Sequence, residues 1–343
     1  EVDPGEVYEV TACGNATMVH LVLGIDPEPL SMAPFTVTTH TAPPVLASDL
    51  GAPVHPRAPA FLFPSLGAYV GGDIVAGMLA TGLTRDRRLR LFIDCGTNSE
   101  IALGSAERVL ACAAPAGPAF EAAQIRCGMR AAEGAIEGVK IGEDDLGLEV
   151  IGDVEPVGLC GSGLVDAVAE LVQAGLLDHS GRFIPDEQAA AEHPGLADRL
   201  TKIGEERVFI LHWRGDDPAA SLFLSQRDIR ELQFAKASIA TGWNILLRDL
   251  GVSVEDISQV LLAGSFGAYL TPLSAVRIGL VPKLALPRIV SAGNVAGEGA
   301  KIAALSLRER AEAHAILHEV EYVELSGRAD FNDLFIDQLA FPG

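Results

Sequence analysis

Apolar residues follow two kinds of pattern along the chain. Short apolar runs, typical of buried β-strands, lie at 91–93, 101–103, 108–113, 260–263 and 289–292. Segments whose apolar side chains recur at helical spacing, and which are therefore predicted as helices, lie at 16–23, 73–80, 164–174, 226–250 and 295–305. A strand is also expected at 7–12 and a helix from about Ala119. Short buried strands alternating with helices predict a layered α/β fold.

The clearest of these elements is the helix at 226–250. Ser225 and Asp228 have the spacing of a capping box, in which each side chain accepts a hydrogen bond from the other residue's backbone. Gly251 follows the last apolar position and is expected to end the helix. By contrast, residues 178–206 are charged and have no clear period, so we expect an exposed, irregular insertion there.

Three glycine-rich turns, at 94–98, 158–163 and 263–267, follow predicted strands. Ligands of α/β proteins bind where strands end and helices begin. Glycines let backbone N–H groups approach phosphate oxygens, and the N-terminus of a following helix favours an anion. Asp94 ends its strand, where a carboxylate is suited to a hydrated Mg²⁺ ion, and Thr97 and Asn98 add hydroxyl and amide donors. None of the turns has the P-loop pattern, and no GxGxxG follows a strand.

Composition narrows the possible partners. The chain has 343 residues, enough for two domains, and 49% hydrophobic residues, enough for a sizeable core. Acidic residues outnumber basic ones 46 to 25, which gives a net charge of −21 and argues against a nucleic-acid or anionic-membrane surface. The five cysteines show no CxxC or ferredoxin spacing, no apolar run reaches membrane-spanning length, and no signal-peptide pattern is present. We expect a cytoplasmic protein with reduced thiols.

The order of these motifs resembles the superfamily of acetate kinase, sugar kinases, heat-shock chaperones and actin. Residues 94–98 resemble its second phosphate loop, the helix at 226–250 followed by residues 260–267 resembles its adenosine motif, and residues 71–80 lie where its first connecting helix belongs. The resemblance implies ribonuclease-H-like lobes, with mixed sheets flanked by helices. Residues 1–90 would be the remainder of the first lobe with the connecting helix. Residues 91–343 would form the second lobe with both turns and the insertion around 178–206.

Within that superfamily the chain is most similar to the ATP-dependent reductive activators of corrinoid proteins. The motifs that carry this similarity lie at 14–18, 93–100, 158–164 and 331–335, and together they extend over nearly the whole chain. Such activators use ATP to help transfer an electron to an inactive Co(II) corrinoid, which gives Co(I). The resemblance implies that this chain is the ATP-binding and ATP-hydrolysing module, with a corrinoid protein as partner and a homodimer as its assembly.

The resemblance also implies a site and its cofactors. Asp94 would be the catalytic residue and would bind Mg²⁺ through water. The residues expected to bind ATP are Gly96, Thr97, Asn98, Gly161, Ser162, Gly163, Gly264, Ser265, Phe266 and Gly267. A [2Fe–2S] cluster is expected only in an N-terminal domain upstream of Glu1, and a DxGTT-like first phosphate loop is expected upstream as well.

Two other functions remain open from the sequence alone. A small-molecule kinase of the same superfamily would need a base near the acceptor hydroxyl, for which Asp73 and Asp166 are candidates. A non-catalytic module would instead respond to nucleotide by closing its lobes on a partner. The acidic surface is expected to dock to a protein and not to nucleic acid or a membrane.

Overall fold

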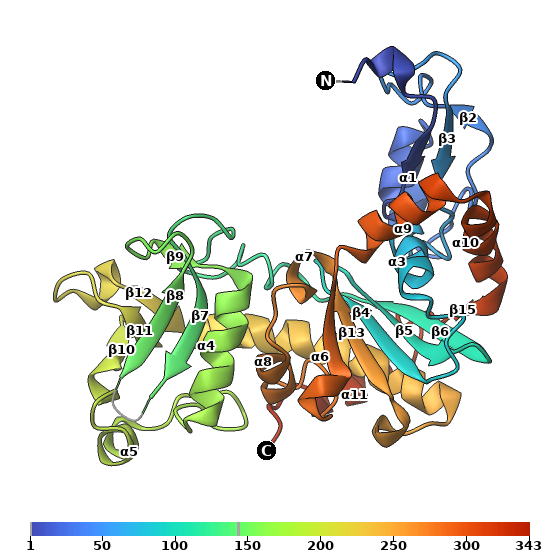
Figure 1. The fold of residues 1–343 in the computed structure, drawn as a ribbon. Coiled ribbons are helices and arrows are strands. Elements are labelled where there is room, and N and C mark those ends of the chain that lie inside the picture. Colours follow the sequence, from blue (N-terminus) through green and yellow to red (C-terminus); the bar gives the residue numbers. More distant parts are fainter. Residues whose placement is uncertain (1, 143–144) are drawn as a thin grey trace.

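A six-stranded mixed sheet forms the centre of the protein in the computed structural model, which describes residues 2–142 and 145–343 (Figure 1). Its strand order is β14-β13-β4-β5-β6-β15. The strands are β4 (Arg90–Asp94), β5 (Ser99–Ser105), β6 (Arg108–Ala114), β13 (Gln259–Ala263), β14 (Ile289–Gly293) and β15 (Val320–Tyr322). β4, β5 and β6 form an antiparallel meander, whereas β13 runs parallel to both β4 and β14, and β15 runs parallel to β6.

Helices cover both faces of this sheet because successive strand residues point to opposite sides. Leu91 and Ile93 pack on the face covered by α6 (Gln226–Leu250). Phe92, between them, packs on the opposite face with α3 (Gly72–Thr81) and α9 (Val295–Leu305). The predicted capping box at the start of α6 and its left-handed end at Gly251, with φ of 69°, are confirmed.

Residues 135–225 form a lobe of their own, at the left of Figure 1, with two three-stranded sheets. We call it the second lobe, although a single lobe was expected over 91–343. Its elements are β7 (Ala135–Ile141), β8 (Leu146–Val150), β9 (Gly158–Leu159), α4 (Gly161–Gln173), α5 (Asp186–Glu192), β10 (Leu200–Ile203), β11 (Glu206–His212) and β12 (Leu222–Ser225). The helix α4 packs on β7 and on α8 (Pro272–Arg277), a helix that follows the central strand β13. Contacts between α4 and α8 therefore join this lobe to the central one.

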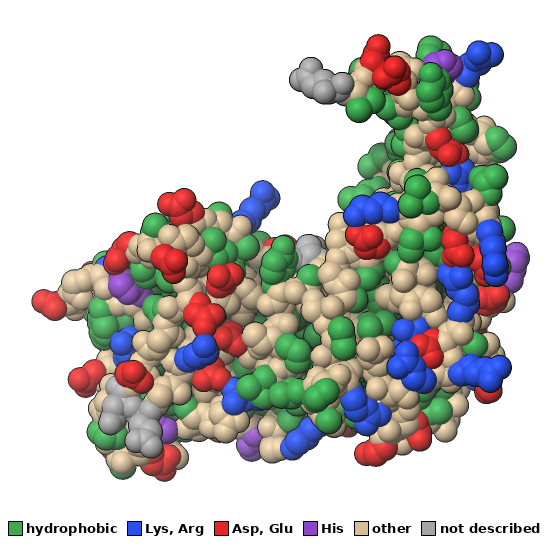
Figure 2. Space-filling view, viewed as in Figure 1, with side chains coloured by type: hydrophobic (Ala, Val, Ile, Leu, Met, Phe, Trp, Pro, Cys, Tyr) green, Lys and Arg blue, Asp and Glu red, His purple; other side chains and the backbone are tan. Residues whose placement is uncertain are grey.

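The N-terminal part lies at the upper right of Figure 1, next to α9 and α10 (Leu307–Glu319). It contains β1 (Val10–Ala12), α1 (Ala16–Val22), α2 (Glu28–Ser31), β2 (Val45–Leu46) and β3 (Pro59–Leu62). The remaining short helices are η1 (Pro4–Glu6), η2 (Ala197–Arg199), η3 (Pro218–Ala220), η4 (Val254–Asp256), η5 (Leu286–Arg288), α7 (Gly264–Gly267) and α11 (Phe331–Asp337). The space-filling view shows the molecule hollowed between this part and the left lobe (Figure 2).

Two expectations about secondary structure are wrong. No helix begins at Ala119: the chain forms successive turns there, and Ala122 has a left-handed φ of 54° that a helix excludes. Residues 178–206 are not an irregular insertion, because they contain α5 and β10 and bury Ala189, Leu196 and Leu200. Those apolar side chains are too widely spaced to produce a periodic signal.

Candidate functional site

The three glycine-rich turns lie next to one another. The first joins β4 to β5, the second opens α4, and the third forms α7 directly after β13. Because β13 pairs with β4, Ala263 lies opposite Asp94, and the Cys95 amide donates to the Ala263 carbonyl at 2.9 Å. A methyl group added at Gly161 would lie 3.3 Å from the Phe266 ring, which brings the second turn against the third.

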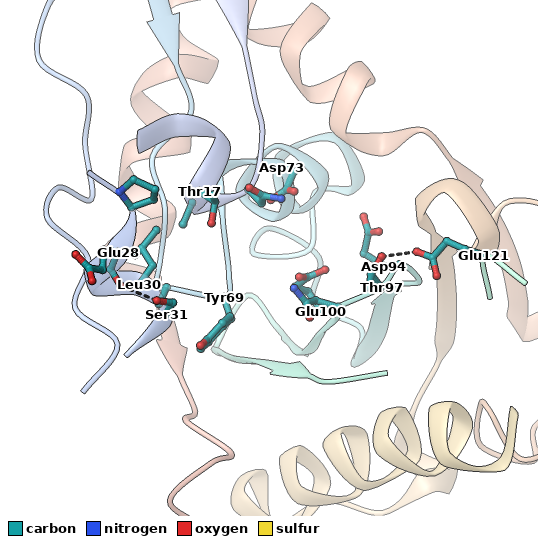
Figure 3. Close-up of a pocket in the computed structure, with 16 residues that line it drawn as sticks. Thr17, Glu28, Leu30, Ser31, Tyr69, Asp73, Asp94, Thr97, Glu100 and Glu121 are labelled. Atoms are coloured by element: carbon teal, nitrogen blue, oxygen red, sulfur yellow. Dashed lines mark hydrogen bonds between the residues drawn. The ribbon is translucent and has the colours of Figure 1, made fainter. Parts of the chain in front are cut away.

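Two adjoining cavities lie between these turns. One, of about 640 Å³, is lined by Asp94, Gly96, Thr97 and Asn98 and reaches toward α1 and α2 (Figure 3). The other, of about 810 Å³, is lined by Phe120, Cys160, Gly161, Ser162 and Phe266. Thr97 and Glu121 border both cavities, so these two side chains mark the boundary between them.

Five carboxyl groups line the first cavity, and those of Asp73, Asp94 and Glu100 have raised pKa values. Burial, with the neighbouring Asp73, raises the pKa of Asp94 to about 7. Burial likewise raises the pKa of Asp73 and holds that of Glu100 well above its usual value, the latter also through the charges of Asp73 and Asp94. Such mutual repulsion is relieved when a cation binds between the groups.

Gly264 shows how closely the first and third turns approach. It has φ of 89°, and a methyl group added there would lie 2.4 Å from Asp94 Oδ1 and 2.5 Å from the Cys95 carbonyl oxygen. Only glycine has both the left-handed backbone and the missing Cβ that this contact requires. Its role is therefore to let the Asp94 turn and α7 touch.

Most residues predicted for the site border the cavities, but a few do not. Those that line a cavity are Asp94, Gly96, Thr97, Asn98, Gly161, Ser162 and Phe266. Gly163 instead allows α4 to pack on β7, because a methyl group there would lie 2.2 Å from the Ile136 carbonyl oxygen. Gly264 and Gly267 contact the first turn, and the side chain of Ser265 lies outside the described part of the structure.

The sequence did not identify three acidic residues of the site. Glu100 lies within the motif at 93–100, but the alternation of β5 gives no hint that its carboxyl reaches the cavity. Asp73 was considered only as the base of a kinase, yet it lines the first cavity from the start of α3. Glu121 lies in the segment mistakenly predicted as a helix, so no pattern pointed to it.

Asp166, the other candidate base of a kinase, forms hydrogen bonds within the fold. Its two oxygens accept hydrogen bonds from the Val139 amide at 2.9 Å and the Ser274 hydroxyl at 2.5 Å. These bonds join α4 to β7 and to α8. The side chain therefore stabilises the second lobe and its contact with the central one.

Within 2–142 and 145–343, no group of three or more His, Cys, Asp or Glu side chains is close enough to hold a metal ion on its own. In the same part of the chain, no helix is both long and apolar enough to cross a membrane.

Comparisons with known proteins extend over almost the entire chain. The family model "C-terminal domain of RACo the ASKHA domain" matches residues 88–343, and the model "RACo middle region" matches residues 1–86. The corrinoid activation enzyme RamQ of Eubacterium limosum is 36% identical over 99% of this chain and 57% of its own length. The [Co(II) methylated amine-specific corrinoid protein] reductase of Methanosarcina barkeri is 24% identical over 81% of this chain and 51% of its own length.

A solved structure agrees with these matches. The reductive activator for corrinoid, iron-sulfur protein superposes with a TM-score of 0.86 and 36% identity, over 99% of this chain and 54% of that one. The chain thus spans a little over half the length of the relatives that it matches, and the expected actin-like ATPase fold is confirmed. On the match of the ASKHA model to 88–343 and of the middle-region model to 1–86, this chain belongs to the RACo family.

Proposed function

We propose that this chain is the ATP-binding and ATP-hydrolysing module of a reductive activator that returns Co(II) corrinoid proteins to Co(I). The observation that carries the proposal is the convergence of three glycine-rich turns, from two lobes, on two adjoining cavities. The names of the relatives supply the substrate class, since those proteins are described as activating or reducing corrinoid proteins.

In this proposal ATP lies across the boundary between the two cavities. Its phosphates would contact Gly96, Thr97 and Asn98 on one side and the start of α4 at Gly161 and Ser162 on the other. A methyl group at Gly96 would have only the Asn98 carbonyl nearby, at 3.0 Å, so the backbone of the turn is open to a ligand.

The carboxyl groups of the first cavity fit a magnesium ion held partly through water. Asp94, Asp73 and Glu100 line one cavity but do not form a three-ligand cluster, and Mg²⁺ usually keeps several waters beside one or two carboxylates. When bound, Mg²⁺ neutralises charge that develops on the phosphates. The Asp94 carboxylate would orient the water ligands from the end of β4.

The adenosine would lie on the side of α7. The Phe266 ring and the Phe120 ring are 6.5 Å apart between centroids and inclined by 30°, and both line the larger cavity. Aromatic faces are suited to stack on a purine base. Gly264, Ser265 and Gly267 would shape the backbone on this side.

The remaining parts of the proposal concern partners. The electron would come from a reduced [2Fe–2S] cluster in an N-terminal domain, which is oxidised by one electron as Co(II) becomes Co(I). The corrinoid protein would dock to the acidic surface of a homodimer in the cytoplasm. ATP would shift the balance between lobe arrangements, by as much as its affinities for them differ.

The decisive experiment measures Co(I) formation by visible spectroscopy, anaerobically, with a Co(II) corrinoid protein. With the same chemical reductant in both assays, this chain joined to a ferredoxin-type [2Fe–2S] domain should form Co(I) in an ATP-dependent manner, whereas residues 1–343 alone should not. The Asp94→Ala variant of the fusion is the control and should lose the dependence on ATP. ATP-dependent Co(I) formation by residues 1–343 alone, or a fusion indifferent to ATP, would contradict the proposal.

A further inference from the structure

The segment 115–125 contacts all three turns of the site. The Gly117 amide donates to the Thr97 carbonyl at 3.0 Å, in the first turn. The Phe120 carbonyl oxygen lies so close to the second turn that a methyl group at Gly161 would be 1.9 Å from it. The Phe120 ring faces Phe266 of the third turn. A displacement of this segment therefore reaches every part of the site.

Glu121 is the charged side chain of this segment that faces the boundary between the cavities. The Thr97 hydroxyl donates a hydrogen bond to Glu121 Oε1 (Figure 3). Glu121 Oε2 is buried and has no hydrogen-bond partner among the described residues. A buried carboxylate oxygen without a hydrogen-bond partner destabilises the fold. Its presence therefore points to a functional role for Glu121.

A terminal phosphate and the Glu121 carboxylate would compete for the same donor. Both are anions that accept hydrogen bonds from a hydroxyl, and two anions at contact distance repel each other strongly in a partly buried site. Thr97 has one hydroxyl proton to donate, so it bonds to one of them at a time. The Thr97–Glu121 bond and a bond from the same hydroxyl to a phosphate therefore exclude each other.

Resting on the nucleotide site proposed above, we propose that Glu121 is a positioning residue that stands in for the terminal phosphate of ATP. Its carboxylate holds the Thr97 hydroxyl until a triphosphate replaces it, and the displaced segment then moves the start of α4. ADP, which has no third phosphate to compete, would leave Glu121 in place. The residue would in this way make the site respond to ATP and not to ADP.

The contacts on both sides of Glu121 explain how its movement would reach the second lobe. The Phe120 carbonyl is held against Gly161, and the Ala122 carbonyl against Gly128, where an added methyl group would lie 1.9 Å away. Ala122, which follows Glu121 directly, has a left-handed φ of 54°. Since the backbone is clamped to a glycine on each side, Glu121 has little freedom to move alone.

The test compares ATP and ADP binding, with Mg²⁺, by calorimetry in the wild type, Glu121→Ala, Glu121→Gln and Glu133→Gln. Glu133 is exposed and borders neither cavity, so its variant controls for the loss of one negative charge. For Glu121→Ala we expect ATP affinity to rise roughly tenfold, the size of one charged hydrogen bond, with ADP affinity changed less than about twofold. Glu121→Gln keeps an acceptor without the charge and should give an intermediate rise, and it guards against a folding defect in the alanine variant.

Hydrogen–deuterium exchange of the same proteins gives a second measurement, which would show no such change if Glu121 had only a structural role. In the wild type, ATP but not ADP should raise exchange in 117–125 and alter it in 158–163, whereas Glu121→Ala should show the raised exchange without nucleotide. If nucleotide binds but the ratio of ATP to ADP affinity in both Glu121 variants equals that of Glu133→Gln, the role of Glu121 is overturned while the nucleotide site stands. If neither the wild type nor any of the variants binds ATP or ADP, both the nucleotide site and the role of Glu121 are contradicted.

Discussion

The Asp94 carboxyl lies at the end of β4, beside Asp73, in a largely buried position. Burial favours its protonated form, whereas a hydrated Mg²⁺ ion needs the ionised form. The two demands oppose each other near neutral pH because the pKa of Asp94 is raised to about 7. At the proposed site, Mg²⁺ binding is therefore expected to depend on pH within the physiological range.

We expect Mg²⁺-dependent ATP affinity to increase as the pH rises from about 6 to about 8, since binding releases the Asp94 proton. The free energy of unfolding should change in the opposite sense. Because the folded-state pKa exceeds the unfolded value of 3.8, this group stabilises the fold most below that value, and the contribution is lost as the pH rises through 7. Titrations at several pH values, with Asp94→Asn as the control for protonation of ATP itself, check this. An equally steep profile in Asp94→Asn would contradict it.

A second expectation at this scale concerns Gly264. Gly264→Ala should lower the free energy of unfolding by about 3 kcal/mol, from backbone strain and from the clash with Asp94, and should weaken ATP binding. Gly293→Ala is the matched control: Gly293 has φ of 69° and open space around it, so strain alone should cost about 1 kcal/mol. Equal losses in chemical denaturation would show that the Asp94 contact does not matter.

At the scale of elements, the crossing of α3 and α9 joins the middle region to the central sheet. The helices approach closely at Gly299, where a methyl group would lie 2.2 Å from the Ala76 carbonyl oxygen. Ile74, Val75 and Met78 of α3 are buried in the same cluster as Phe92 of the sheet. This contact positions Asp73, at the start of α3, against the cavity that Asp94 lines.

We therefore expect Gly299→Ala to lower the free energy of unfolding by about 2 kcal/mol, although alanine is otherwise favoured over glycine in helices by about 1 kcal/mol. Gly297→Ala, two residues earlier in α9, is the control. Its added methyl group would meet only the Asn294 side chain, at 2.9 Å, which caps α9 by accepting a hydrogen bond from the Gly297 amide. Weakening this cap costs about 1 kcal/mol, which the helix preference of alanine offsets, so stability should stay nearly unchanged. The opposite ranking in denaturant melts would show that the helices can separate without cost.

At the scale of the whole molecule, the proposed ligand would contact turns from two lobes. Thr97 and Phe266 belong to the central lobe, and Gly161 opens a helix of the second lobe. A ligand that bonds to both sides stabilises the arrangement in which they are closest. Figure 2 shows a hollow between the second lobe and the N-terminal part, which closure of the lobes would narrow.

Small-angle X-ray scattering of chromatographically purified protein checks this expectation. Saturating ATP and Mg²⁺ should lower the radius of gyration, because the lobes close on the ligand. Asp94→Ala should remain at the nucleotide-free value under the same conditions. A wild-type radius that does not change while calorimetry shows full occupancy would mean that nucleotide binds without closure.

Local signals in the sequence determined much of the fold. The strands of the central sheet other than β15, the long helix α6 with its capping box and Gly251, and the three turns were predicted, because each depends on residues only a few positions apart. The identity of the family followed from the same turns, since their residues and order resemble one family more than any other. Asp94, Thr97 and Gly161 were placed in the site on this basis, and they line its cavities.

The tertiary structure alone decided which side chains meet. Asp73, Glu100 and Glu121 come from a helix, a strand and a turn segment, and their convergence depends on the packing of α3 and on the Phe120–Gly161 contact. Turns form at 119–125, where a helix was predicted, and the Phe120 and Ala122 carbonyl oxygens lie against Gly161 and Gly128, where any side chain would collide with them. Periodicity and spacing describe neighbours along the chain, whereas burial, charge repulsion and close backbone contact arise between residues that only the folded chain brings together.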